Sequence, residues 1–400
     1  MTQTMQGFPP PSGAQVTLAN WRLAPFNRWA FHHVREILPT ADIANDPFDI
    51  AVWAKAPVDT ADWRIDAGAG STLPFAQYLE ASATDAIAIV HRGRLVYEWY
   101  APGNGPATAH ILMSVSKSML ALVAGILAGH GELDLSRDVA TIVPELGATA
   151  YAGATVRQLL DMRSGVAFDE DYSATSGPIV EYRKSTGWNP LAPAEEPSDL
   201  RSFYRALTAS EGPHGGRFHY VSPNSDLLGW VIERATGTRF ADLASELLWQ
   251  PSGASRSAYI TVDRFGAPRC AGGMCICVRD LALIGQLLVA GGARGGKQVV
   301  PAAWIDDVFA NGDRGAWEAG SFVDLFSGRP MHYRSQWYVE HGLQPLLFGL
   351  GIHGQNLYVD PTRQIVVAKL SSQAAPLDPA GIEVTRRAID AIAGELTALA

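Results

Sequence analysis

One serine and one lysine have a spacing that suits nucleophilic catalysis. Ser114 and Lys117 stand three residues apart at the start of an apolar, alanine-rich segment, and on a helix this spacing puts both side chains on one face. A serine hydroxyl attacks poorly until a base removes its proton, and a lysine can be that base where burial keeps it neutral. We therefore predict Ser114 as nucleophile and Lys117 as its base. The amide of Ser114, unpaired at the helix start, can also face a developing oxyanion.

The same pattern also fits an ordinary helix start. A serine that caps a helix, followed by a solvent-exposed lysine, needs no catalysis to explain it. With 25 serines and 5 lysines in the chain, chance alone gives roughly 0.3 such spacings. The apolar segment favours the catalytic interpretation, because it puts the lysine beside a buried helix face.

Two later segments carry residues that would complete such a site. Tyr220 precedes a predicted helix, where it could relay a proton to the leaving group, with Ser222 and Asn224 to orient it. The stretch 349–354 contains three glycines and His353, so its backbone can approach a ligand closely. Taken alone, the first segment also fits a helix-capping loop and the second a β-bulge.

Composition and motif spelling exclude several other functions. The chain carries 40 acidic and 31 basic side chains, a net charge of -9, so we expect no nucleic-acid partner. No apolar stretch reaches about 18 residues and the start lacks a signal-sequence pattern, so we expect a cytoplasmic chain with no membrane segment. Neither G-x-S-x-G nor H-E-x-x-H occurs. The three cysteines match no zinc or disulfide pattern, and we expect no metal and no cofactor.

The order of predicted elements favours an α+β fold. A β-hairpin over 85–100 and C-terminal strands over 335–339, 355–359 and 364–370 surround a helical middle. Helices are predicted over 114–130, 156–162, 200–209, 226–236, 240–249, 278–289 and 381–399. We expect a flexible arm over 1–17 and a single catalytic unit over 18–400. Its α/β lobe would comprise about 18–113 and 270–400, with a helical lobe, about 114–269, inserted.

Taken in order, the three motif segments resemble those of the serine β-lactamase and penicillin-recognising superfamily. Within it, the chain resembles the 6-aminohexanoate-dimer hydrolases, nylon-oligomer amidases with esterase activity. The segments that carry this likeness are 27–31, 38–40, 112–118, 170–172, 351–357 and 367–372. The resemblance spans about residues 18–372. It implies a serine β-lactamase-like fold, with an antiparallel sheet lobe flanked by helices and an inserted, mostly helical lobe.

The resemblance also implies roles for individual residues. Ser114 would be the nucleophile, Lys117 its base and Tyr220 the proton relay. The amides of Ser114 and Ile352 would form the oxyanion hole. The implied substrate-binding residues are Tyr172, Arg183, Trp188, Ser222, Tyr338 and His353, with Tyr172 contacting the substrate amide and Trp188 and Tyr338 forming pocket walls. Tyr172 would also fit a surface loop with no role in binding. Trp188 and Tyr338 would also fit a buried core.

Three departures from the superfamily pattern affect the expected substrate. The third motif has no lysine, and Ser222 stands where β-lactamases and transpeptidases usually carry asparagine. The missing cationic clamp for a substrate carboxylate weakens a β-lactam or peptidoglycan role. Arg183 falls where the most amidase-competent relatives place an acidic residue that could face a substrate ammonium. A cation there would repel that group, so we expect esterase activity to exceed amidase activity.

The sequence therefore predicts a serine hydrolase that acts through an acyl-enzyme on small linear amides and carboxylic esters. Its expected partner is that small-molecule substrate. The sequence is also compatible with a homodimer. Three alternatives also stay open. They are a β-lactamase or D-peptide-processing enzyme, a noncatalytic binding protein on the same fold, and a metal-dependent hydrolase that chelators would inactivate.

Overall fold

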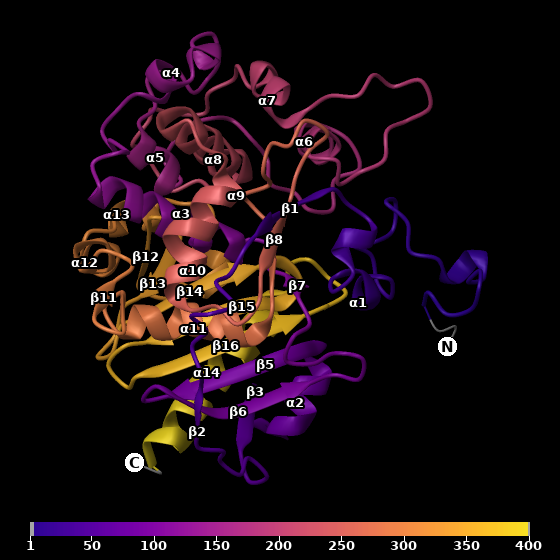
Figure 1. Cartoon of the computed structure of the whole chain (residues 1–400), viewed down its shortest axis with the longest axis vertical. Helices are drawn as coiled ribbons and strands as arrows, with labels where there is room; N and C mark the ends of the chain where they lie inside the picture. Colours follow the sequence, from indigo (N-terminus) through magenta and orange to yellow (C-terminus); the bar gives the residue numbers. More distant parts are fainter. Residues whose placement is uncertain (1–3, 399–400) are drawn as a thin grey trace.

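The computed structural model describes residues 4–398. These residues form a central eight-stranded sheet with helices around it (Figure 1). The strand order is β12-β13-β14-β15-β16-β5-β6-β2, and neighbouring strands are antiparallel except β2 and β6. The strands are β12 (Met331–Arg334), β13 (Trp337–Glu340), β14 (Leu346–Gly351), β15 (Gln355–Asp360), β16 (Ile365–Ser371), β5 (Thr84–His91), β6 (Arg94–Tyr100) and β2 (Ala54–Lys55). Pairing of β16 with β5 joins the two ends of the chain into one sheet.

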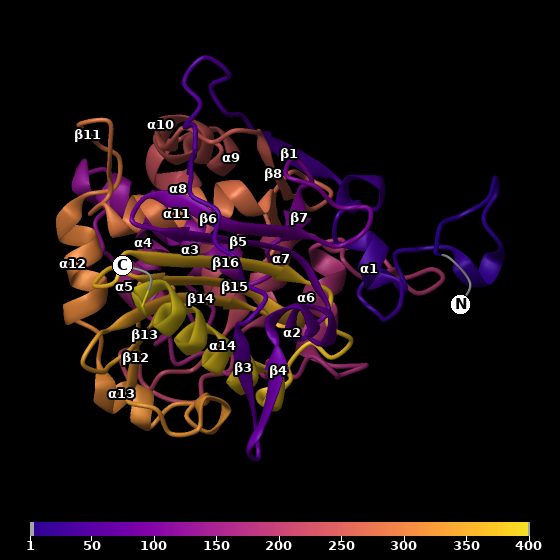
Figure 2. The same cartoon turned by 90° about the horizontal axis from the view of Figure 1, so that it is seen from below.

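Helices cover both faces of this sheet, which explains why its central strands are apolar throughout. In β5, Ala86, Ala88 and Val90 face one core, whereas Ile87 and Ile89 face the other. This alternation follows from the two-residue repeat of a strand. Helix α11 (Val278–Val289) packs on the first side, and α14 (Pro379–Ala398) lies on the opposite side (Figure 2).

A buried helix connects the sheet to the helical part of the molecule. Helix α3 (Val115–Gly129) is buried from its start to Leu127, and it contacts β14 on one side and α8 (Ser222–Thr236) on another. A small sheet, with the order β1-β8-β9-β7, leads into it. Its strands are β1 (Thr40–Ile43), β8 (Ala258–Thr261), β9 (Met274–Ile276) and β7 (His110–Ile111).

The remaining elements are short and lie around this framework. The helices are α1 (Asn27–Ala30), α2 (Phe75–Ala81), α4 (Val139–Ile142), α5 (Val156–Leu160), α6 (Pro178–Ser185), α7 (Leu200–Phe203), α9 (Phe240–Leu243), α10 (Gln250–Ser252), α12 (Ala302–Ala310) and α13 (Arg314–Glu318). The strands form two hairpins, β3 (Arg64–Gly68) with β4 (Ser71–Pro74) and β10 (Ala293–Arg294) with β11 (Lys297–Gln298). Within residues 4–398, no helix is long and apolar enough to cross a bilayer.

The predicted α+β class and the order of elements are confirmed, with several corrections at element ends. Helix α8 begins at Ser222 rather than 226, because Pro223 fits the first turn of a helix. The strand predicted from 335 begins at Trp337, since Ser335 and Gln336 have positive φ values of 50° and 62°. The helix over 200–209 is shorter than predicted and ends in a 3-10 turn at Ala206.

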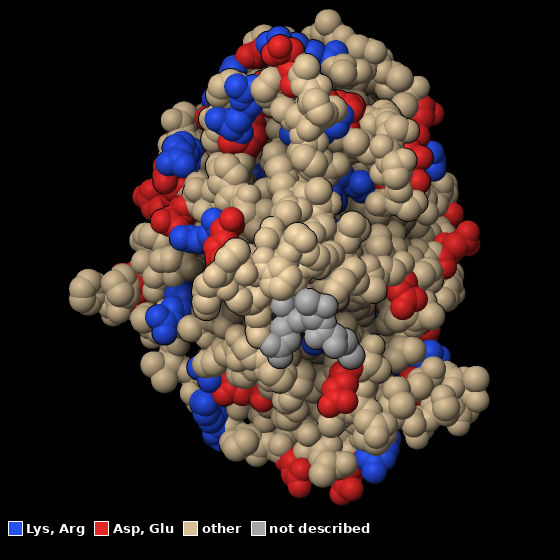
Figure 3. Space-filling model, turned by 90° about the vertical axis from the view of Figure 1, so that its right-hand side faces the viewer, with Lys and Arg blue, Asp and Glu red and all other residues tan. Residues whose placement is uncertain are grey.

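The sequence analysis missed the small sheet, β12 and β14. Strands of two to four residues lie below the length at which alternation can be recognised, and β14 is interrupted by glycines. The proposed division into an arm and two lobes stays a prediction. The segment after residue 4 projects to one side of the molecule, away from the sheet (Figure 1). On the face seen in Figure 3, charges of both signs are interspersed around a largely uncharged centre.

Two glycines in helices should respond oppositely to the same substitution. A Cβ on Gly285 in α11 would lie 2.3 Å from a Val366 methyl group and 3.1 Å from Leu357, so we expect Gly285→Ala to destabilise the fold by about 1–3 kcal/mol through overpacking. Gly394 in α14 faces open space, and Gly394→Ala should stabilise by about 0.4–1 kcal/mol. Urea unfolding measures both. Equal shifts of one sign would contradict the described packing of α11 on the sheet.

Candidate active site

Ser114 lies at the first turn of α3, in a sharply bent piece of backbone. The preceding residue, Met113, has a φ of 45°, which is strained for a residue with a side chain. The end of β14 passes directly beside this turn. A Cβ on Gly351 would lie 2.6 Å from the Leu112 carbonyl oxygen and 3.1 Å from the Ser114 nitrogen. Only glycine therefore allows the strand to come this close to the serine.

The approach of β14 also brings Ile352 to the serine. Ile352 follows Gly351 directly, and it lines the same pocket as Ser114. Ser114 and Ile352 therefore border the same pocket from two different elements. The assignment of their amides to an oxyanion hole remains a proposal, which this arrangement supports.

Lys117 is fully buried, and its amine is surrounded by three oxygen atoms. The Nζ atom donates to Ser114 Oγ at 3.0 Å, Ser222 Oγ at 3.1 Å and the Ala271 carbonyl at 2.7 Å. Burial lowers the pKa of Lys117 to about 7, and the Glu170 carboxylate opposes this shift. At neutral pH a substantial fraction of the amine is therefore unprotonated and can accept a proton from the Ser114 hydroxyl.

A buried ion pair fixes the carbonyl that Lys117 contacts. Asp226 of α8 pairs with Arg269 and accepts a hydrogen bond from the Ala271 amide at 2.6 Å. Tyr182 donates to the same carboxylate. Because the amide of Ala271 is held, its carbonyl has a fixed direction toward the lysine. The sequence analysis gave Asp226 and Arg269 no site role, since they act through the backbone.

Tyr220 is buried next to the lysine and keeps its proton. Burial raises the pKa of Tyr220 well above its usual range, so its hydroxyl is a donor at neutral pH. Its ring stacks on Phe322 at a centroid distance of 4.9 Å, and Lys117 Nζ lies 4.9 Å from the same ring. The hydroxyl also interacts with Ser114, which partly opposes the pKa shift.

Ser222 and Asn224 have different positions, although we expected both to orient Tyr220. Ser222 contacts Lys117 as described, whereas the Asn224 side-chain oxygen accepts hydrogen bonds from Tyr151 and Ser164, each at 3.0 Å. Asn224 is completely buried. It therefore fixes the start of α8 from the core side, and Ser222 is the member of the pair that faces the lysine.

Glu170 is a site residue that the sequence analysis did not single out. Its carboxylate accepts hydrogen bonds from the Tyr172 hydroxyl at 3.0 Å and from the Ser222 amide at 2.9 Å, and the Ser222 hydroxyl also donates to it. The carboxylate thus joins the tyrosine loop to the start of α8. In the sequence, Glu170 stood only within the segment 170–172 that carries the family likeness, with no role assigned to it.

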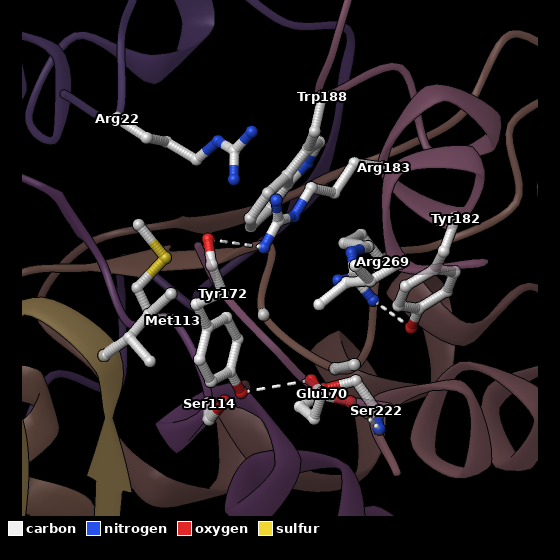
Figure 4. Close-up of a pocket in the computed structure, with 14 residues that line it drawn as sticks. Arg22, Met113, Ser114, Glu170, Tyr172, Tyr182, Arg183, Trp188, Ser222 and Arg269 are labelled. Carbon is white, nitrogen blue, oxygen red and sulfur yellow. Dashed lines mark hydrogen bonds between the residues drawn. The ribbon is translucent and has the colours of Figure 1, made fainter. Parts of the chain in front are cut away.

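A pocket opens beside Ser114 and gathers most of the predicted substrate-binding residues (Figure 4). It is lined by Arg22, Met113, Ser114, Glu170, Tyr172, Ile179, Tyr182, Arg183, Trp188, Ser222, Arg269, Ala271, Gly272 and Ile352. Trp188 is held by a hydrogen bond to Thr261 at 3.2 Å and packs edge-on against Trp21. Its indole therefore forms a rigid pocket wall.

Two predicted substrate-binding residues, Tyr338 and His353, do not line this pocket directly. Tyr338 is buried in an aromatic cluster, stacked on Phe348 at 5.2 Å, and it does not line the pocket. Burial raises the pKa of Tyr338, and its neighbours Tyr220, Tyr172 and Glu170 add to that shift. Tyr338 therefore lies near the reacting groups, and its role as a pocket wall stays a prediction. His353 has a φ of 63° and pairs with the Gln373 carbonyl at 2.7 Å. It borders an outer hollow next to the pocket.

The comparisons identify the family of the chain. A family model described as Beta-lactamase matches residues 75–391. The chain belongs to this family. It is 36% identical to 6-aminohexanoate-dimer hydrolase from Paenarthrobacter ureafaciens, over 92% of this chain and 91% of that protein.

Solved structures agree with this assignment. The structure named "Putative 6-aminohexanoate-dimer hydrolase from Bacillus anthracis" has a TM-score of 0.87 and 28% identity, covering 97% of this chain and 98% of that one. A family VIII carboxylesterase matches with a TM-score of 0.59 and 18% identity, over 79% of this chain and 95% of the other, and shares the fold. The predicted β-lactamase-like fold is confirmed, and this beta-lactamase family member is a hydrolase related to 6-aminohexanoate-dimer hydrolase.

The unusual state of Lys117 can be measured directly, because the chain has only five lysines. In NMR spectra of protein with 13C-labelled lysine, we expect two signals to titrate near pH 7, those of Lys117 and the equally buried Lys369. Lys117→Met and Lys369→Met assign them. Glu170→Gln should lower the pKa of Lys117 further, since a negative charge is removed, and leave that of Lys369 unchanged. Titration of Lys117 near 10.4, the ordinary value, would contradict the described burial.

Proposed function

We propose that this chain hydrolyses small linear amides and carboxylic esters through an acyl-enzyme on Ser114. The observation that carries the proposal is the buried Lys117 amine, 3.0 Å from the Ser114 hydroxyl, with a pKa near 7. A serine at the start of a helix is common, but a serine bonded to a lysine that loses its proton near neutral pH is an activated nucleophile. The relation to amidases and esterases gives independent support.

In the first step, Ser114 Oγ attacks the substrate carbonyl carbon while Lys117 takes the hydroxyl proton. The carbonyl oxygen gains the negative charge, which the amides of Ser114 and Ile352 stabilise. As this intermediate collapses, the bond from carbon to the leaving nitrogen or oxygen breaks. Tyr220 gives that atom a proton and recovers one from Lys117, so that the alcohol or amine departs neutral and an ester of Ser114 remains.

In the second step, a water molecule replaces the leaving group. Lys117, now neutral again, accepts a proton from water as the water oxygen attacks the acyl carbon. The intermediate releases a carboxylic acid, and the proton returns to Ser114 Oγ. Ser222 and Glu170 act as positioning residues in both steps, because they hold the lysine and the Tyr172 loop together.

We further propose that esters react faster than amides. An aryloxide or alkoxide leaves with less help from Tyr220 than an amine, whose nitrogen must be protonated as it departs. In 6-aminohexanoate linear dimer the acyl part ends in an ammonium group. Arg183 lines the pocket, so a substrate ammonium that extends into it meets a like charge.

Labelling with a fluorophosphonate should modify Ser114 alone, as read from intact mass and peptide mapping. The labelling rate should rise with pH through about 7, because Lys117 must lose its proton to act, and level off above. Lys117→Arg keeps the charge but stays protonated, and we expect its rate to fall at least about 100-fold. A fully active Ser114→Ala variant, or an arginine variant with the parent's rate, would overturn the mechanism.

The balance between substrates should depend on Arg183. We expect kcat/KM for p-nitrophenyl hexanoate to exceed that for 6-aminohexanoate linear dimer. Arg183→Asp should lower KM for the dimer and have little effect on the uncharged ester, with a benefit that shrinks at high salt. The same change on both substrates would show that Arg183 does not face the bound ammonium.

A further inference from the structure

Two arginines from distant parts of the chain point into the pocket that holds Ser114 (Figure 4). Arg22 lies near the N-terminal segment, and Arg183 lies in α6. Arg183 donates to the Tyr172 carbonyl at 3.1 Å, and Arg22 donates to the side-chain oxygen of Asn189. These acceptors are neutral. Within residues 4–398, neither guanidinium forms an ion pair with a carboxylate.

The third arginine of the pocket shows the contrast. Arg269 is paired with the buried Asp226, so its charge is balanced. Glu170, the carboxylate that lines the pocket, is already bonded to Tyr172 and Ser222. Neither guanidinium therefore has a carboxylate within ion-pair distance, although the nearby charges of Glu170 and Asp171 partly offset the lowering of the Arg183 pKa by burial.

This arrangement is costly for the protein alone. Burial, together with the like charges of Arg183 and Arg269, lowers the pKa of Arg22 to about 9. The Nε atom of Arg22 is buried and has no hydrogen-bond partner in the part of the chain that the structure describes. Removing cations from water without a counter-charge is unfavourable, and an anion bound between the two groups would offset that cost.

The position of Tyr220 indicates which part of a substrate reaches these arginines. As the proposed proton donor, Tyr220 must contact the leaving group. Its ring packs against Phe218 and Phe322, and it does not line the pocket that contains Arg22 and Arg183. We therefore infer that the leaving group lies toward Tyr220 and that the acyl part of the substrate extends toward the arginines.

We propose that Arg22 and Arg183 form a binding site for a carboxylate at the far end of the acyl chain. The preferred substrates are then half-esters and half-amides of aliphatic dicarboxylic acids. Paired N–H groups of guanidinium suit the geometry of a carboxylate, and the apolar surfaces of Met113, Ile179 and Trp188 suit the methylene chain between. This inference rests on the proposed acyl-enzyme function. It concerns a different carboxylate from the one in the sequence analysis, where the missing clamp was the lysine of the third motif.

The test compares acyl chains that differ only in their terminal charge. With p-nitrophenol as leaving group, the six-carbon chain ends in a carboxylate (adipate), a methyl-capped carboxylate or an ammonium (6-aminohexanoate), and seven- and eight-carbon diacids extend the series. We expect kcat/KM for the best half-ester to exceed that of its methyl-capped partner at least about tenfold, with the ammonium ester lowest. A second pair, 4-carboxyphenyl hexanoate and its methyl ester, carries the charge on the leaving group and should show no such preference.

Variants connect the preference to the two arginines. Arg22→Gln and Arg183→Gln should each reduce the ratio of carboxylate to capped ester at least about fivefold, mainly through KM. Lys184→Gln is the matched control. It removes a positive charge from the next residue of α6, but this amine is paired with Glu181 and Glu195. In the Lys184→Gln variant, the ratio of kcat/KM for the carboxylate ester to that for the capped ester should change less than about twofold, as expected for a surface charge.

The outcomes separate this inference from the proposed function. The carboxylate site is overturned if the parent shows no preference at any chain length, if neither arginine variant reduces the ratio, or if only the leaving-group pair shows a preference. In each of these cases fluorophosphonate labelling of Ser114 and turnover of the capped esters remain. Absence of labelling and of all ester turnover in the parent would instead overturn the proposed function.

Discussion

The burial of one ammonium group is the constraint on which the site depends. Lys117 is 1% exposed, and removing a lysine from water favours its neutral form. In a purely apolar environment the Lys117 amine would have no hydrogen-bond acceptor. With a carboxylate in direct contact, the amine would stay protonated. The structure lies between these limits, because two hydroxyls and one carbonyl surround Nζ, while the Glu170 carboxylate contacts Ser222 instead of the lysine.

The fold supplies that environment from four separate segments. Helix α3 brings Ser114 and Lys117, and α8 brings Ser222. The segment after Arg269 brings the Ala271 carbonyl, and the end of β14 closes the other side. Close packing is needed at each contact. Gly349 and Gly351 allow β14 to approach α3, since a Cβ on either would come within 3 Å of an oxygen atom of α3 or of the residues just before it. Dense packing of this kind excludes the water that would otherwise restore the ordinary pKa of the lysine.

The charges around the pocket act on a different property, the choice of substrate. Lys117 and Tyr220 are buried, and Ser114 lies between them and the pocket; these three residues are the proposed reacting groups. Arg22 and Arg183 line the same pocket as Ser114, and we propose that they select the acyl group. The fold itself does not set this choice, because one fold can carry different pocket residues and so accept different substrates.

The sequence by itself determined the local parts of the site. The three-residue spacing of Ser114 and Lys117, the apolar composition of α3 and the glycines of β14 are properties of short segments. They predicted a nucleophilic serine, and the resemblance of these segments to a known superfamily implied the β-lactamase-like fold. Only the tertiary structure decided which distant residues join them. Glu170, Arg22 and Asp226 carry no local signal, because their roles depend on charges and hydrogen bonds between segments far apart in the chain. Tyr338 shows the same limit. Its aromatic type suits a pocket wall or a core equally, and only the pairing of β13 with β14 brings it into the cluster that contains Tyr220.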